Sequence, residues 1–143
     1  LKNRLETMIR RDGVADRVRI RKLAYEDMAS VYRENDLLLF PSKQTSTWEE
    51  QYGMVLLEAM ASGLPIFGYD SGAVGAVVGR AGALSRASRP DGLVKLIKAA
   101  VRGNGLKKLA SFSRRRAEQL YDSRKTAKTI GTIYKEVANY ERK

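Results

Sequence analysis

The 143-residue sequence contains no cysteine and no histidine. Without cysteine the chain can form no disulfide and no thiolate metal site, which fits a reducing compartment. Without histidine it has no Ser-His-Asp triad, no histidine metal cluster and no histidine acid–base chemistry. No apolar run approaches the roughly 20 residues that cross a bilayer, and no signal-peptide pattern opens the sequence. We therefore expect a cytoplasmic protein, with a peripheral position at the inner face of the membrane as a further option.

Acidic residues are scarce relative to basic ones. The 27 lysines and arginines face 16 aspartates and glutamates, for a formal net charge of +11. From position 102 onward, twelve basic residues stand against four acidic ones. Three interpretations are open: solvated helix faces, attraction to anionic lipid around a lipid-linked partner molecule, or nucleic-acid binding. Aromatic residues are not interleaved with these charges in a base-stacking pattern, so nucleic acid is the least favoured partner.

Hydrophobic periodicity predicts strands that alternate with helices. Short apolar runs predict strands at 18–23, 37–40, 66–67 and 83–84, the second being a continuous run covered on both faces. Helical spacing predicts an opening helix that ends at Asp12-Gly13, helices at 25–33 and 54–61, a short one starting within 70–75, and three after Pro90. The alternation predicts an α/β fold, a Rossmann-like parallel sheet with helices on both faces and a helical C-terminal end. We expect one domain over 1–143, with a core at 1–89 and helices at 90–143.

The stretch from Trp48 to Pro65 organises the chain. Its run from Met54 to Ala61 is apolar on every side except for Glu58, so we expect a buried helix of about three turns. Gly63 suits the left-handed position after a helix end, and Pro65 cannot continue the helix. A carboxylate buried without partners is costly, so we expect Glu58 to face a polar site.

The residues before this helix suit an elongated anionic ligand. Gly53 lets a ligand approach the first free backbone N–H groups, which lie at the positive end of the helix dipole and favour phosphate. Glu50 lies eight residues before Glu58, a separation of roughly 12 Å or more along a helix axis. This span suits the two ends of a diphosphate between hydroxyl-bearing rings better than two ligands of one metal ion. The segments 41–53 and 70–75 would lie beyond the carboxyl ends of the strands, where parallel sheets bind ligands.

A set of motifs surrounds this stretch. They are Pro41-Ser42, E-x7-E from Glu50 to Glu58 with Gly53 inside it, E-A-M-A-S-G-L-P at 58–65, Y-x-x-x-D at 32–36, D-S-G at 70–72 and A-G-A-L at 81–84. As a set they resemble the C-terminal, donor-binding domain of retaining GT-B glycosyltransferases of family 4 (glycosyl transferases group 1). The resemblance covers most of 18–84, with a looser helical match at both ends.

The resemblance implies roles for individual residues. Glu50 would be the catalytic residue, which contacts the transferred sugar and stabilises charge near the anomeric centre. Glu58 would accept hydrogen bonds from the ribose hydroxyls of the nucleotide, because a carboxylate offers two acceptor oxygens. The implied donor-binding residues are Glu58, Gly53, Met54 and Val55, with a possible nucleobase or sugar loop at Leu23, Ser42 and Gly72.

Each role has a simpler alternative. Glu50 could be an acid at a helix N-terminus, worth ~0.3 to 1 kcal/mol through the dipole. Glu58 could form a buried ion pair with one of the many arginines. The family often has two glycines and then a glutamate after the D-S-G motif, whereas here Gly72-Ala73 is followed by Ala76. We therefore expect 70–75 to be a turn whose backbone, rather than its side chains, matters.

The resemblance also implies an activity. It is glycosyl transfer from a nucleoside diphosphate sugar with retention of configuration, without a metal or other cofactor, in polysaccharide or glycolipid synthesis. The family's domain begins with two central strands that carry a basic pair for the diphosphate, and an acceptor domain precedes it. Neither is in this sequence, so we expect the chain alone to be inactive. Two hypotheses for the sheet are open: either 18–23 pairs directly with 37–40, or the missing strands belong to a longer protein. The alternative is a non-catalytic basic module that binds nucleic acid or an anionic membrane surface.

Overall fold

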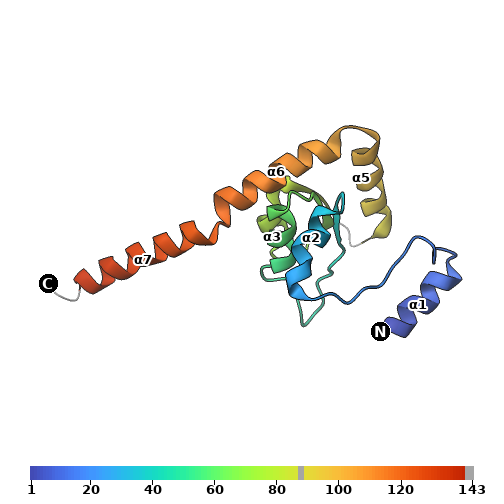
Figure 1. Ribbon diagram of the computed structural model, residues 1–143, viewed down its shortest axis with the longest axis horizontal. Helices are drawn as coiled ribbons and strands as arrows, with labels where there is room; N and C mark the ends of the chain where they lie inside the picture. The colour runs from blue at the N-terminus through green and yellow to red at the C-terminus, as the bar shows by residue number, and fades with distance from the viewer. Residues whose placement is uncertain (87–88, 141–143) are drawn as a thin grey trace.

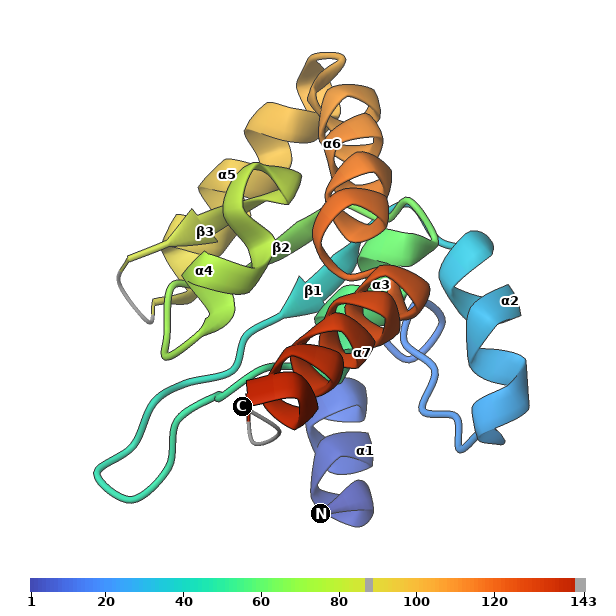
Figure 2. The same cartoon turned by 90° about the vertical axis from the view of Figure 1, so that its left-hand side faces the viewer.

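The computed structural model describes residues 1–86 and 89–140. Its centre is a parallel three-stranded sheet in the order β1-β2-β3, formed by β1 (Leu38–Phe40), β2 (Ile66–Tyr69) and β3 (Gly82–Ser85). In the register of the sheet, Phe67 of β2 lies between Leu39 of β1 and Ala83 of β3. The α/β fold with a parallel sheet is therefore confirmed (Figure 2).

Helices separate and cover the strands, as Figures 1 and 2 show. In chain order the helical elements are α1 (Lys2–Arg11), the 3-10 turn η1 (Tyr25–Asp27), α2 (Met28–Arg33), α3 (Met54–Ala61), α4 (Val74–Val78), the 3-10 turn η2 (Gly79–Ala81), α5 (Pro90–Arg102), α6 (Gly105–Leu120) and α7 (Ser123–Tyr140). Helix α3 packs against β2, α5 against β2 and β3, and α6 against α3 and η2. The predicted alternation of strands and helices is therefore present from β1 onward.

Strand β2 is the most deeply buried element, since all four of its residues are buried. Ile66 packs in one cluster with Leu56 and Met60 of α3 and with Val74 and Val78 of α4, all of them inaccessible to solvent. Burial of such side chains contributes about 1.5–3 kcal/mol each. The core therefore lies between the sheet and the helices that follow β1 and β2.

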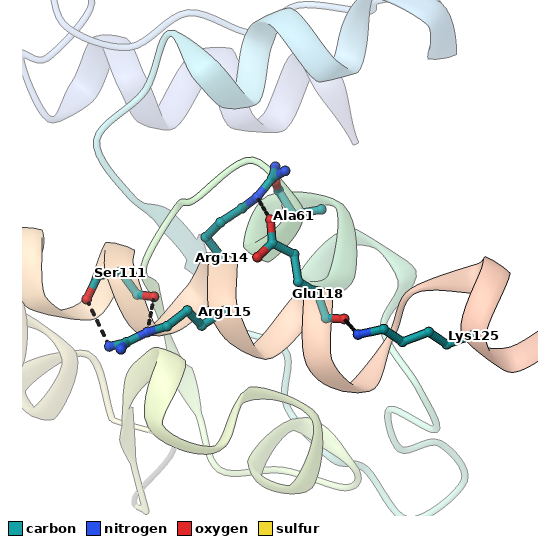
Figure 3. A network of polar contacts seen from close by, with 6 residues as sticks. All are labelled: Ala61, Ser111, Arg114, Arg115, Glu118 and Lys125. Carbon is teal, nitrogen blue, oxygen red and sulfur yellow. Dashed lines mark hydrogen bonds and ion pairs between the residues drawn. The ribbon is translucent and has the colours of Figure 1, made fainter.

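Helix α6 fastens the ends of two other helices through arginine side chains. Arg116 donates from Nε to the Val77 carbonyl oxygen at 2.7 Å and from Nη2 to that of Ala76 at 2.6 Å, at the end of α4. Arg114 donates from Nη1 to the carbonyl oxygen of Ala61, the last residue of α3 (Figure 3). A cation is favourable at a helix C-terminus, because it meets the unpaired carbonyls and the negative end of the dipole. These two arginines therefore hold α3 and α4 to α6.

The strand predicted at 18–23 is not formed, and that prediction was wrong. Residues 18–24 have no regular secondary structure, and the Val18 N–H donates to the Val14 carbonyl oxygen at 3.0 Å. A strand needs a neighbour that satisfies its backbone groups, and no strand in the described ranges pairs with 18–23. The direct pairing of this segment with β1 does not occur, so β1 is an edge strand.

Two further expectations of burial were wrong. Leu39 in the middle of β1 is 48% exposed, because no described element covers that face of the edge strand. Helix α3 has the predicted bounds, although its eight residues form about two turns rather than three, and Met54 in its first turn is 58% exposed rather than buried. The core cluster begins only at Leu56, so the first turn of α3 extends beyond it. The end of α3 is as predicted, with Gly63 in the left-handed region at φ +81°.

The two terminal helices stand apart from this core. Neither α1 nor α7 has a buried residue, and Figure 1 shows them extending from opposite sides of the body. Three helices do follow Pro90, but α7 does not close the domain as expected; α5 and α6 pack on it instead. Within the residues that the structure describes, no helix is both long and apolar enough to span a membrane.

A substitution at Gly68 should test the contact between β1 and β2. A Cβ atom at this position would overlap the carbonyl oxygen of Phe40 on the neighbouring strand. We expect Gly68→Ala to lower the free energy of unfolding by at least ~1–3 kcal/mol, because a backbone atom cannot move aside as a side chain can. Urea unfolding followed by circular dichroism measures the change.

Gly103→Ala is the matched control. Gly103 ends α5 with φ −114°, and a Cβ there would lie 3.8 Å from its nearest neighbour, the Ala99 carbonyl oxygen. This variant should unfold within ~0.5 kcal/mol of the unsubstituted chain. Equal effects of the two substitutions would contradict the close packing of β1 on β2.

Candidate functional site

Glu58 is held by two tyrosine hydroxyls. Tyr25 donates from its hydroxyl to Glu58 Oε1 at 3.0 Å, and Tyr32 donates to Oε2 at 2.9 Å. Tyr32 is 5% exposed and reaches Glu58 from α2, whereas Tyr25 is 72% exposed and lies on η1. Glu58 is half-buried against these two hydroxyls of the preceding helical segment, and its place in a polar ligand site stays a prediction. No ion pair to Glu58 is present among the described residues, which removes the buried-arginine alternative.

The negative charge of Glu58 changes the titration of both tyrosines. Burial first, and then the hydrogen bond to Glu58, raise the pKa of Tyr32 to about 12. The same kind of hydrogen bond is the main cause that raises the pKa of Tyr25. Both hydroxyls therefore stay protonated near neutral pH and donate to Glu58, and the carboxylate is held in one orientation.

Two hollows meet at Glu58. One, of about 400 Å³, lies between η1, α2 and α3 and is lined by Tyr25, Met28, Ala29, Tyr32 and Glu58 among others. The other, of about 380 Å³, lies between α3 and the junction of α6 and α7, with Met54 and Tyr121 in its wall. Glu58 thus lines both hollows, and each has room for part of a ligand.

Glu50 lies at the other end of α3, where two chain segments touch. The Ala73 N–H donates to the Glu50 carbonyl oxygen at 2.7 Å. Gly72 has φ +54°, and a Cβ on it would overlap that oxygen and lie 3.0 Å from the Glu50 nitrogen. The turn after β2 therefore needs glycine for a close backbone approach, which agrees with the expectation for 70–75.

Gly53 brings the Glu50 side chain close to the start of α3. It has φ +70°, and a Cβ on it would lie 2.7 Å from Leu56 Cδ1 and 3.6 Å from Glu50 Cδ. No side chain caps α3, and Met54 and Val55 in its first turn are exposed. The structure therefore brings together Glu50, Gly53 and Gly72 beside an uncapped helix N-terminus.

The remaining predicted site residues are Leu23 and Ser42. Leu23 is half-buried in the irregular segment 18–24, and Ser42 is half-buried two residues after β1. Among the described residues, no hydrogen bond or ring contact joins either of them to Glu50 or Glu58. Their proposed part in a nucleobase or sugar loop stays a prediction.

Sequence reasoning missed two features of this region. Tyr25 carried no motif signal, and position 32 was noted only as the tyrosine of the Y-x-x-x-D motif, not as a partner of Glu58. Ser71, in the turn after β2, is 6% exposed, and its hydroxyl is the one buried side-chain polar atom without a hydrogen-bond partner in the described part of the chain. Around the site and elsewhere in the described residues, no group of three acidic side chains is placed to hold a metal ion.

The basic segment of α6 is used inside the fold. Besides its bond to Ala61, Arg114 forms an ion pair with Glu118, with Nε and Oε1 2.6 Å apart (Figure 3). Arg115 donates from Nε to the Ser111 carbonyl oxygen of the same helix at 3.1 Å. Lys125 donates to the Glu118 carbonyl oxygen at 2.6 Å. Arg114 and Lys125 thus bind carbonyls at the ends of α3 and α6, so the charge in this region is not only a solvated face.

Comparisons with known proteins agree on one family. The sequence profile described as "Glycosyl transferases group 1" matches residues 1–102. A curated relative, the D-inositol 3-phosphate glycosyltransferase of Rhodococcus erythropolis, is 36% identical over 101 residues, which are 66% of this chain and 21% of the relative. The chain thus spans about a fifth of the length of that protein.

A solved structure has the same fold. The sucrose-phosphate synthase of Thermosynechococcus elongatus superposes with a TM-score of 0.81 over 96% of this chain and 34% of its own, at 22% sequence identity. At this identity the likeness concerns the fold. It extends over nearly the whole chain, including helices beyond the segment that the family profile matches.

The Tyr32–Glu58 pair predicts a loss of stability in alkali. The folded-state pKa of Tyr32 is about 12, above its ordinary value of 10.0. Neutral Tyr32 therefore contributes stability that is complete below about pH 10 and is lost as the pH rises through about 12. The contribution is on the order of 2 kcal/mol. Urea unfolding from about pH 9 to about pH 12 measures it.

Tyr32→Phe supplies the comparison, because it keeps the ring and removes the hydroxyl. Below about pH 10 the free energies of unfolding of the two proteins should differ by a constant amount. Above about pH 10 this difference should shrink. Parallel stability curves over the whole range would show that Tyr32 does not titrate as the structure requires.

Proposed function

Because the chain belongs to the glycosyl transferases group 1 family, whose profile matches residues 1–102, we propose that it supplies the donor-binding site of a glycosyltransferase. The donor is a nucleoside diphosphate sugar that lies along α3. The observation that carries this proposal is the Glu58 carboxylate, oriented by two tyrosine hydroxyls at the wall of a hollow of about 400 Å³.

Glu58 is suited to accept two neighbouring hydroxyls of a ribose. Each carboxylate oxygen has two lone pairs, and Tyr25 and Tyr32 use one on each oxygen. One acceptor site per oxygen remains, and the two oxygens lie side by side as the hydroxyls of a vicinal diol do. The tyrosine rings and Met28 add apolar surface beside the carboxylate, against which a nucleoside can pack.

The N-terminus of α3 is suited to the diphosphate. Gly53, Met54 and Val55 lie where backbone N–H groups have no partner inside the helix, at the positive end of its dipole. Gly53 has no side chain to obstruct an approaching anion, and no side chain caps the helix. The charge that develops on the leaving diphosphate would be stabilised by these N–H groups.

Glu50 would contact the transferred sugar. Its backbone is tied to the turn at 71–73 and its carboxylate lies over Gly53, so it is held next to the site proposed for the diphosphate. There it would stabilise positive charge at the anomeric carbon. Retention of configuration and transfer without a metal ion are parts of the proposal that rest on the motif resemblance.

The acceptor would be bound by other parts of a longer protein. The chain spans 21% of the length of the curated relative and 34% of the solved one, so the acceptor, its linkage and any contact with a lipid surface belong to the proposal for the whole protein. The alternative of a non-catalytic basic module is less well supported. Arg114 and Arg116 donate hydrogen bonds to carbonyl oxygens of α3 and α4, so part of the basic segment stabilises the fold instead of facing an external anion.

Nucleotide titrations test the donor site. We expect one of UDP, GDP and ADP to bind in calorimetric titration of the chain, and Glu58→Gln to weaken that binding about tenfold or more, because the amide loses a charged acceptor. Glu49→Gln is the control, since Glu49 is an exposed neighbour of Glu50 and should leave the affinity within about twofold. Absence of binding by all three nucleotides, or equal losses in both variants, would contradict a donor site centred on Glu58.

A further inference from the structure

Another hollow, away from Glu58, is lined by three arginines, two of which lie over one aromatic ring. It has a volume of about 280 Å³, lies between η2 and α6, and is lined by Arg80, Ala81, Phe112, Arg115, Arg116 and Gln119. No carboxylate is among these lining residues. The wall therefore carries three positive charges and no negative one.

The arrangement follows from helical spacing and one facing turn. Phe112, Arg115, Arg116 and Gln119 stand at i, i+3, i+4 and i+7, which places them on one face of α6. Arg80 comes from η2 opposite. The guanidinium carbons of Arg80 and Arg115 lie 4.9 Å and 5.0 Å from the centre of the Phe112 ring, which is within the range of cation–π attraction.

The two walls of the hollow are fastened to each other. Ser113, which is fully buried on α6, donates from Oγ to the Ala81 carbonyl oxygen at 2.9 Å. Arg116 binds the carbonyls of Ala76 and Val77 just before η2. The backbone positions of α6 and η2 that carry the three arginines are therefore fixed next to each other.

Many of the donors in this hollow are not used by the protein. An arginine has five N–H donors. Arg115 bonds only Ser111 of its own helix, and among the described residues no hydrogen bond or ion pair engages Arg80. Arginine forks match the oxygens of phosphate, and such charge-assisted bonds are about twice as strong as neutral ones.

We propose that this hollow is a binding site for a phosphate group, with Arg80 and Arg115 as its main ligands and Gln119 as a further donor. It lies at the opposite end of the sheet from the turn that holds Glu50, and it shares no lining residue with either hollow at Glu58. Ala81 directly precedes β3, at the amino end of the strands, whereas the turn at 71–73 follows the carboxyl end of β2. The site is therefore separate from the proposed transfer chemistry and does not depend on it.

The phosphate can come from a soluble phosphorylated compound or from a phospholipid headgroup, and two assays separate these sources. The first is a titration with inorganic phosphate followed through the backbone amide signals of Arg80 and Gln119 by nuclear magnetic resonance. The second is cosedimentation with vesicles of phosphatidylcholine, with and without phosphatidylglycerol. Each is run on the unsubstituted chain, Arg80→Gln, Arg115→Gln and the control Arg102→Gln.

The control removes the same charge from an exposed position at the end of α5, and Arg116 is left intact because it fastens α4. We expect saturable shifts at Arg80 and Gln119, weakened about tenfold in Arg80→Gln and Arg115→Gln and unchanged in Arg102→Gln. The same pattern in cosedimentation with anionic vesicles would identify a lipid headgroup as the source. No local shift and no vesicle binding, or equal losses in all three variants, would overturn the proposal, since binding would then be absent or due to overall charge.

Discussion

The burial of β2 between two parallel neighbours is the constraint on which the rest of the structure depends. Ile66 to Tyr69 are buried throughout, and both edges of the strand are paired. A parallel strand in this position needs cover on both faces, which α3, α4 and α5 supply in part. Segments without a neighbour on each side are less buried or less regular. Leu39 of the edge strand β1 is exposed, and 18–23 forms no strand despite its alternating apolar residues.

The same arrangement positions both ends of the candidate site. Because β1 and β2 are parallel, the loops that follow them begin at the same, carboxyl end of the sheet. Gly72 lets the backbones of these two loops touch at Glu50. Helix α3 then carries the chain back past α2, where Glu58 meets Tyr25 and Tyr32. One short helix thus joins an uncapped N-terminus to an oriented carboxylate, the two features on which the proposed donor site rests.

The arginine side chains of this basic chain make two different kinds of contact. Arg114 and Arg116 bind carbonyls at the ends of α3 and α4, where a cation also meets the helix dipole. Arg80 and Arg115 instead stack on Phe112 and keep unused donors. Charge counted along the sequence does not separate these uses, because they differ in which carbonyl or ring lies within reach.

The sequence by itself determined the features that depend on neighbouring residues. Apolar runs located β1, β2 and β3, and glycines marked the ends of α1 and α3. Tertiary structure alone decided the partners of Glu58, which lie 33 and 26 residues before it. It also decided that 18–23 forms no strand. It decided, finally, that the adjacent residues Arg114, Arg115 and Arg116 of α6 contact different groups. The physical reason is range: helix periods and turn residues act over a few positions, whereas hydrogen bonds and strand pairing depend on which distant segments the fold brings together.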